Sequence, residues 1–289
     1  MITLTIVRHG ESTDNLKALW AGWADAPLSV HGMNQAKALG ESFKSTKIHH
    51  IFASDLLRAN WTAQQIHRNQ PEPKCQLITS TLFREQHFGD AERKPFGGKD
   101  GWQRKPGRTF KFENGESPND VRNRANEAIH KFIEPILSEC HGSPATQRHV
   151  VVVAHGIYNA EFLGALLARR RDHKPLEWGY KGMTNTGWTR AELGYIDEFS
   201  RTPTPANVTT NPSGPNSPSS SPGSPPPLVE EDDEGLLGPG LTMRILCTDV
   251  TTHLQGVHRQ KGGIGSTGFD EKQGDIRKFF GGGGNTSKV

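Results

Sequence analysis

Arg8, His9 and Gly10 come directly after an apolar run, residues 2–7, that is typical of a buried β-strand. A strand that ends in this way places an imidazole and a guanidinium at the carboxyl edge of a sheet, where α/β proteins bind ligands. A neutral imidazole is a nucleophile, and a guanidinium fork matches the oxygens of a phosphate group. Gly10 has no Cβ, so the backbone can approach a ligand closely. The segment therefore predicts phosphoryl transfer to His9.

Further polar residues follow other strand-like runs. Arg58 lies shortly after residues 51–53, Glu85 follows a run around residues 77–78, and His155 directly follows residues 150–154. Because the carboxyl ends of parallel strands share one edge of a sheet, residues far apart in sequence can form one site. A phosphate monoester carries about −1.5 to −2 charges and three strong acceptor oxygens. Two arginines and a second histidine supply enough donors to bind it without a metal ion.

With these residues in place, the chain resembles the histidine phosphatase superfamily, which has the phosphoglycerate mutase-like fold. The resemblance covers roughly residues 1–195. It is carried by Arg8 to Glu11, Asp14, Asn15, the turn at 27–29 with Gly32, Gln35 and Ala36, residues 54–59 with Thr62 and Ala63, Glu85, Phe88, Gly89, residues 115–117, His155 and Gly156. It implies a three-layer α/β/α fold with a mostly parallel central sheet.

The resemblance also implies a role for each central residue. His9 would attack phosphorus, and Glu85 would give a proton to the leaving oxygen and then take one from water. The catalytic set is completed by Arg8, Arg58 and His155, and the substrate-binding set consists of Arg8, Asn15, Arg58, His155 and Gly156. The first turn of the helix after His155 is expected to add backbone N–H donors to the anion. No cofactor and no metal ion are expected.

The activity implied is that of a metal-independent phosphatase, acting on a small phosphorylated metabolite or a phosphoprotein. Two alternatives stay open at this stage. One is a phosphoglycerate mutase-type phosphotransferase, and the other is an interaction module of a nuclear assembly. After Phe88 and Gly89 the chain has Ala91, Glu92 and Arg93 where family members often have Trp-Glu-Gly. This departure weakens any transfer of substrate specificity, though not of the reaction.

Three helices can be placed from caps and periodicity. Ser29 is a suitable N-cap for a helix with Ala36, Leu39, Gly40 and Phe43 on one face. A second helix is expected at residues 56–67. Ser117, Pro118 and Asp120 suit the N-cap, N1 and N3 positions of a third, which continues to residue 136.

The chain has 289 residues, a net charge of +3 and three cysteines whose spacing fits neither a zinc site nor a disulfide framework. No apolar run approaches the roughly 20 residues that span a bilayer, and the chain begins with a strand rather than a signal peptide. We therefore expect a protein of the cytoplasm, the nucleus or both. Neither membrane association nor direct nucleic-acid binding is expected.

A basic stretch at residues 93–111 holds seven lysines and arginines and one acid, Asp100. One interpretation is a lid that steers polyanionic substrates toward the site. The other is a solvated charged loop.

The composition divides the chain into three parts. Residues 1–200 and 241–257 are expected to form one discontinuous catalytic domain. The resemblance to the histidine phosphatase superfamily, whose members often finish with two sequential strands, implies neighbouring strands at 187–193 and 243–247. Residues 201–240, rich in Pro and Ser and then acidic, are expected to be a disordered insertion between those strands. Residues 258–289 are expected to form a flexible basic, Gly-rich tail.

The tail carries one motif of its own. Gln273, Ile276, Phe279 and Phe280 have the spacing of the peptide that docks on the DNA sliding clamp, PCNA, which this segment resembles. One 3₁₀ turn would gather the apolar side chains into a plug, with Gln273 reaching a polar pocket. The alternative is that the phenylalanines pack back onto the catalytic domain.

Overall fold

The computed structural model describes residues 1–95, 102–142, 147–171, 180–196, 240–261 and 263–268. Within them lies a six-stranded sheet with the order β3-β2-β4-β1-β5-β6. The strands are β1 (Ile2–Arg8), β2 (His50–Ser54), β3 (Gln76–Ser80), β4 (Arg148–Ala154), β5 (Trp188–Tyr195) and β6 (Leu241–Val250). The neighbours among β1 to β4 pair in parallel, whereas β5 is antiparallel to both β1 and β6.

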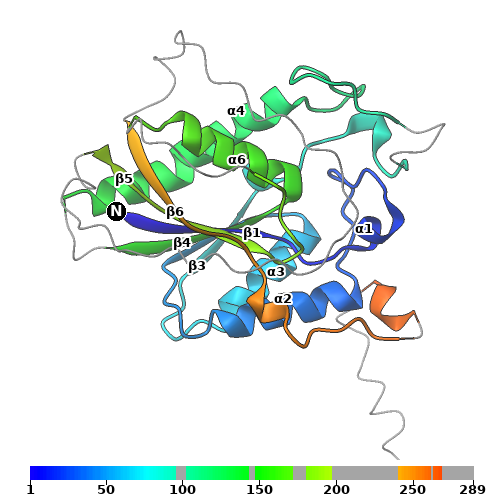
Figure 1. Cartoon of the computed structure of the whole chain (residues 1–289), viewed down its shortest axis with the longest axis horizontal. Helices are drawn as coiled ribbons and strands as arrows, with labels where there is room; N and C mark the ends of the chain where they lie inside the picture. Colours follow the sequence, from blue (N-terminus) through cyan, green and yellow to red (C-terminus); the bar gives the residue numbers. More distant parts are fainter. Residues whose placement is uncertain (96–101, 143–146, 172–179, 197–239, 262, 269–289) are drawn as a thin grey trace, which may run out of the picture.

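Helices cover both faces of this sheet (Figure 1). The α-helices are α1 (Thr13–Lys17), α2 (Val30–Ser42), α3 (Leu57–Arg68), α4 (Pro118–Ala128), α5 (Glu134–Cys140) and α6 (Gly156–Ala168). A π-helical turn (Ile129–Ile133) joins α4 to α5, and short 3₁₀ turns lie at Thr81–Phe83, Gly89–Ala91, Thr252–Leu254 and Ile264–Ser266. Helices α2 and α3 pack on one face, and α4 and α6 pack on the other (Figure 1). The predicted three-layer fold with a mostly parallel sheet is confirmed.

The central strands are buried on both faces, which explains their continuous apolar runs. In β4, Val150 and Val152 belong to the core under α4 and α6. Val151 and Val153 belong to the core under α2 and α3. This double burial fixes the position of β1 and β4, whose ends carry the two histidines of the predicted site.

The predicted helix starts are confirmed. The Ser29 hydroxyl accepts from Gly32 N at 2.9 Å and caps α2. Ser117 and Asp120 form a reciprocal capping box at α4, with Pro118 in the first turn. Local caps of this kind satisfy N–H groups that have no partner within the helix, so they are readable from a short stretch of sequence.

The predicted pairing of the last two strands is also confirmed. Leu193 lies opposite Met243 in the antiparallel β5–β6 pair, with a register irregularity near Arg190. The segment expected to be disordered, 201–240, falls outside the described residues except for Gly240. Strand β6 therefore adds to the same sheet although residues 196–240 separate it from β5 in the sequence.

The beginning of the predicted tail is not free of the domain. Val30 N donates to Thr267 O at 2.9 Å, and Ser29 forms a β-bridge with Gly268. The guanidinium of Arg259 also pairs with the Glu11 carboxylate. The expectation of a flexible tail from residue 258 stays a prediction, although Arg259 contacts Glu11, and Thr267 and Gly268 contact the N-terminus of α2. Among the described residues, no helix is both long and apolar enough to cross a membrane.

Candidate active site

Strands β1 and β4 end side by side, and each is followed by a histidine, His9 after β1 and His155 after β4. Arg8 is the last residue of β1 and pairs with Ala154, the last residue of β4. His9 N donates to Ala154 O at 3.0 Å, which holds the chain just beyond the sheet edge. The rings of His9 and His155 consequently lie 5.1 Å apart, centroid to centroid. The parallel register of two buried strands thus brings together residues 146 positions apart in sequence.

The His9 ring is oriented by its own neighbour. Nδ1 lies 2.6 Å from the Gly10 carbonyl oxygen. A carbonyl oxygen only accepts, so Nδ1 carries the proton and the lone pair lies on Nε2. Burial, and next the charges of Arg58 and Arg8, hold the pKa of His9 well below its ordinary value of 6.5. His9 is therefore a neutral imidazole with Nε2 available as a nucleophile at neutral pH.

His155 is fully buried, and the pKa of its ring is likewise held well below 6.5, first by burial and then by Arg58. Neither ring nitrogen has a hydrogen-bond partner within the described residues. Being neutral, the ring has one N–H to donate. A buried polar ring of this kind, next to a nucleophile, points to a ligand as its partner.

Arg58 lies in the first turn of α3 and is only 1% exposed. Its two terminal nitrogens donate to Ala24 O at 3.2 Å and Gly22 O at 2.8 Å. These carbonyls belong to the loop after α1, so that loop sets the direction of the guanidinium. Burial lowers the pKa of Arg58, but a guanidinium stays charged in proteins.

Both arginines keep a buried donor without a partner. Arg8 Nη1 donates to Met183 O at 2.6 Å, while Arg8 Nε and Arg58 Nε find no acceptor within the described residues. Together with the His155 ring, these groups form a set of donors near the His9 ring. Such donors suit a tetrahedral anion with several oxygens.

Glu85 follows β3 and a 3₁₀ turn, and its carboxylate lies at the N-terminus of α6. Its two oxygens accept from Tyr158 N at 2.9 Å and Ile157 N at 3.1 Å. The expectation that the first turn of α6 binds the substrate anion is therefore wrong for these two N–H groups. The positive end of the helix attracts the nearest carboxylate, which is that of Glu85.

Gly156 separates Glu85 from Arg8. A Cβ on Gly156 would lie 3.8 Å from Arg8 Nε and 3.9 Å from Glu85 Oε2. The carboxylate and the guanidinium thus face the same small space, which is where the leaving group and the phosphoryl oxygens of a bound ester would meet.

Asn15 takes part in the capping box of helix α1 and contacts a residue that binds the nucleophile segment. Its side-chain oxygen accepts from Ser12 N at 3.0 Å in the capping box of α1. The same oxygen is 3.4 Å from Asn185 Nδ2, which also donates to His9 O at 3.1 Å. The predicted substrate contact of Asn15 stays a prediction.

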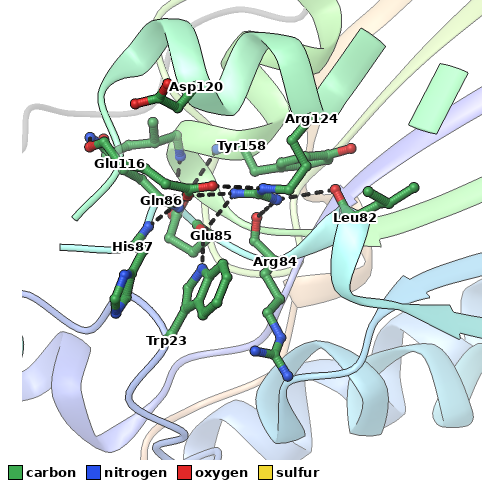
Figure 2. Close-up of polar contacts among 12 residues, drawn as sticks. Trp23, Leu82, Arg84, Glu85, Gln86, His87, Glu116, Asp120, Arg124 and Tyr158 are labelled. Carbon is green, nitrogen blue, oxygen red and sulfur yellow. Dashed lines mark hydrogen bonds and ion pairs between the residues drawn. The ribbon is translucent and has the colours of Figure 1, made fainter. Parts of the chain in front are cut away.

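Two residues that hold the site escaped sequence analysis. Trp23 Nε1 donates to Glu85 O at 2.7 Å, and Arg124 donates to the same oxygen at 3.0 Å (Figure 2). Both contacts end on a backbone carbonyl, and no spacing in the sequence marks such a contact. The one sign of this contact in the sequence was the position of Arg124, next to an apolar position, Ala125, on an amphipathic helix.

A cleft of about 1150 Å³ is lined by Arg8, Glu85 and Gly156 of the site. Its lining also carries two further cations, Arg104 from the basic stretch and Lys181, and two further carboxylates, those of Glu161 and Asp249. In the described part of the chain, no three His, Cys, Asp or Glu side chains gather as a metal site would require.

Residues 4–196 match the family described as Histidine phosphatase superfamily, branch 1. The chain belongs to this superfamily. Fructose-2,6-bisphosphatase TIGAR of Xenopus tropicalis is 35% identical over 141 residues, which is 47% of this chain and 51% of the frog protein. A probable phosphatase of Schizosaccharomyces pombe is 33% identical over 176 residues, which is 60% of this chain and 59% of the yeast protein. The chain thus spans little more than half the length of these two relatives.

Other histidine phosphatase relatives include a mutase and a solved phosphatase. A 2,3-bisphosphoglycerate-dependent phosphoglycerate mutase of Bartonella bacilliformis is 32% identical over 165 residues, which is 53% of this chain and 76% of the mutase. The structure of a mycobacterial glucosyl-3-phosphoglycerate phosphatase with VO3 has a TM-score of 0.55 and 27% identity, covering 67% of this chain and 92% of that chain. A phosphohistidine mechanism is general to the superfamily.

Proposed function

We propose that the protein hydrolyses phosphate monoesters through a phosphohistidine intermediate on His9. The observation that carries the proposal is the Nδ1–Gly10 O contact of 2.6 Å, which leaves the lone pair of Nε2 free next to unpartnered donors of Arg8, Arg58 and His155. The mycobacterial phosphatase of similar structure has been solved with VO3 and with inorganic phosphate, which supports the binding of such anions by this fold.

In the first step, Nε2 of His9 forms a bond to phosphorus while the bond from phosphorus to the ester oxygen breaks. Arg8, Arg58 and His155 donate to the non-bridging oxygens, and Glu85 transfers a proton to the leaving alkoxide. In the second step, Glu85 takes a proton from water, whose oxygen attacks phosphorus and displaces Nε2. Positioning and charge stabilisation are the main requirements of phosphoryl transfer, and this set of side chains supplies both.

The substrate we propose is a small phosphorylated metabolite with a further polar group. The cleft exceeds what a phosphate ion needs, and its lining holds both cations, Arg104 and Lys181, and carboxylates, Glu161 and Asp249. Two relatives are named as phosphatases of sugar-derived phosphates, which supports the same class. A phosphoprotein is the alternative substrate, and a panel of both classes at equal concentration separates them by kcat/KM.

The decisive experiment replaces the nucleophile. Unaltered protein and His9→Asn are mixed with a ³²P-labelled aryl phosphate, and acid-labile phosphate on the protein is measured together with phosphate release. We expect label and turnover in the unaltered protein, and neither in His9→Asn. The control is His130→Asn, an exposed histidine of the π-helical turn. Release without acid-labile label, or label that survives His9→Asn, would contradict the proposal.

A mutase activity is the second candidate, because the Bartonella relative is named as one. A mutase must return the phosphoryl group to an organic hydroxyl before water attacks. Incubation with 3-phosphoglycerate and catalytic 2,3-bisphosphoglycerate separates the two activities. Free phosphate as the product supports hydrolysis, and 2-phosphoglycerate as the product supports the mutase.

A further inference from the structure

Arg124, from α4, makes an unusual set of contacts with the segment that carries Glu85. Its guanidinium donates to three main-chain oxygens of that segment: Leu82 O at 3.1 Å, Arg84 O at 2.7 Å and Glu85 O at 3.0 Å. Figure 2 shows the three contacts converging on one side chain, 42 residues away from Leu82 in sequence. The Arg124 side chain is only 12% exposed. Three hydrogen bonds of the Arg124 side chain are therefore made to the backbone of one short segment, residues 82–85.

That segment has little regular structure of its own. After the 3₁₀ turn Thr81–Phe83, residues 84–88 belong to neither helix nor strand. Carbonyl groups in such a segment need partners from elsewhere. The guanidinium has five N–H donors in a rigid fork, so it can hold several of them in fixed directions at once.

Glu116 binds both Arg124 and the backbone N–H of His87, which follows Glu85 by two residues. Its carboxylate accepts from Arg124 Nε at 3.0 Å and Nη2 at 2.8 Å, and from His87 N at 2.9 Å. Its own backbone oxygen accepts from Gln86 Nε2 at 2.6 Å. The backbone is thus held at Arg84 and Glu85 by Arg124 and at His87 by Glu116.

Arg124 also contacts Tyr158, the residue whose backbone N–H binds the Glu85 carboxylate. Its guanidinium lies 5.4 Å from the centre of the Tyr158 ring. Tyr158 N in turn donates to the Glu85 carboxylate at 2.9 Å. One side chain therefore touches both the backbone that carries Glu85 and the residue that binds its carboxylate.

We propose that Arg124 is a positioning residue for Glu85, and this rests on the proton-transfer role given to Glu85 above. Its charge is matched by Glu116, and its donors bind that carboxylate and three carbonyls, so it acts through Glu85 and not on the phosphoryl group. Loss of Arg124 displaces the carboxylate from the leaving oxygen while leaving His9 and the phosphate donors in place.

The test uses leaving groups of different basicity. A p-nitrophenolate leaves without a proton, whereas the alkoxide of glycerol 3-phosphate needs one. Since kcat/KM covers the steps up to phosphoryl transfer to His9, it isolates the protonation step. General acid catalysis contributes about 10²–10⁴-fold. For Arg124→Met we expect kcat/KM to fall by ~100-fold or more with the alkyl ester and by less than ~10-fold with the aryl ester.

Two further variants keep the proposal testable if Arg124→Met folds poorly. Arg124→Lys keeps the charge but not the fork, and Glu116→Gln weakens the hold on Arg124. Each is expected to show the same preference for the aryl ester, to a smaller extent. The control is Arg169→Met, which removes another buried arginine, one bound to Glu134 and far in sequence from the Glu85 segment.

Equal losses with both esters in the Arg124 and Glu116 variants would overturn the proposal, as would the same preference in Arg169→Met. Failure of the proposed function looks different. In that case the unaltered protein would form no acid-labile phosphate with the aryl ester.

Discussion

The Asp249 carboxylate binds both the backbone N–H and the hydroxyl of Thr184, each at 2.8 Å, across 65 residues of sequence. Thr184 begins a loop that braces the nucleophile segment. Thr186 N donates to Arg8 O at 3.1 Å, and Asn185 Nδ2 donates to His9 O at 3.1 Å. The end of β6, the last strand of the sheet along the chain, thus supports the end of β1.

We therefore expect Asp249→Ala to lower kcat/KM by roughly tenfold, because the loop loses its charge-assisted hydrogen bonds. The loss should be equal for aryl and alkyl phosphates, since Arg8 and His9 serve both. Glu192→Ala is the control, because its ion pair with Arg244 joins the same two strands. Unchanged kinetics in Asp249→Ala would show that the loop holds its place without the carboxylate.

The pH dependence follows from the state of His9. The nucleophile must be deprotonated, and burial with Arg58 and Arg8 lowers the pKa of His9 well below 6.5. The acid limb of kcat/KM, corrected for substrate ionisation, should therefore lie below pH 6.5. Arg58→Met removes one cause of the lowered pKa and should move this limb toward higher pH. A limb at pH 6.5 in the unaltered protein would contradict the expectation.

The backbone of Gly32 touches the nucleophile segment. A Cβ at this position would lie 2.0 Å from Glu11 O and 2.7 Å from Glu11 N. Gly32→Ala should therefore displace the residues after His9, lowering both kcat/KM and the free energy of unfolding, the latter by about 1–3 kcal/mol. Gly268→Ala is the control, since a Cβ there would make only ordinary contacts, with Pro27 Cγ at 3.6 Å and Thr13 Cγ2 at 3.7 Å. If Gly32→Ala had the same kcat/KM as the unaltered protein, the close contact between Gly32 and Glu11 would not affect the position of His9.

Stability should depend on pH through His149. Burial, and next Arg190, lowers the pKa of this buried histidine to about 3. Between pH 6.5 and about 3 the unfolded chain binds a proton that the folded protein does not, so stability falls as the pH falls. His149→Gln should reduce this dependence by about 1.4 kcal/mol per pH unit. Urea unfolding at pH 7.5, 6 and 5 measures the free energy of unfolding, with the exposed His130→Gln as control. The same pH dependence in His149→Gln as in the unaltered protein would contradict a lowered pKa of His149.

The clamp motif of the tail, with Gln273, Ile276, Phe279 and Phe280, lies outside the described residues. We propose binding to PCNA through these side chains, which would place the protein in the nucleus as well as the cytoplasm. Calorimetry with the full chain should detect binding that the double variant Phe279→Ala/Phe280→Ala loses and Lys288→Ala retains. Equal binding by the double variant would exclude the motif.

Much of the fold could be predicted because its determinants are local or periodic. Ser29 and Ser117 cap helices within three residues of themselves. The valines of β4 are apolar at successive positions because the strand is buried on both faces. The resemblance to the superfamily predicted that β5 and β6 are neighbours. The strand-like runs before His9, Arg58, Glu85 and His155 predicted that these side chains share one edge of the sheet.

The sequence by itself determined which groups could do the chemistry and which secondary structures carry them, since propensity, capping and alternation act over a few residues. Only the tertiary structure decided what those groups bind. Two N–H groups of α6 bind Glu85, Arg124 binds the carbonyls of residues 82, 84 and 85, and Asp249 binds Thr184. Such hydrogen bonds link loops tens of residues apart, and their geometry depends on packing that no local pattern records.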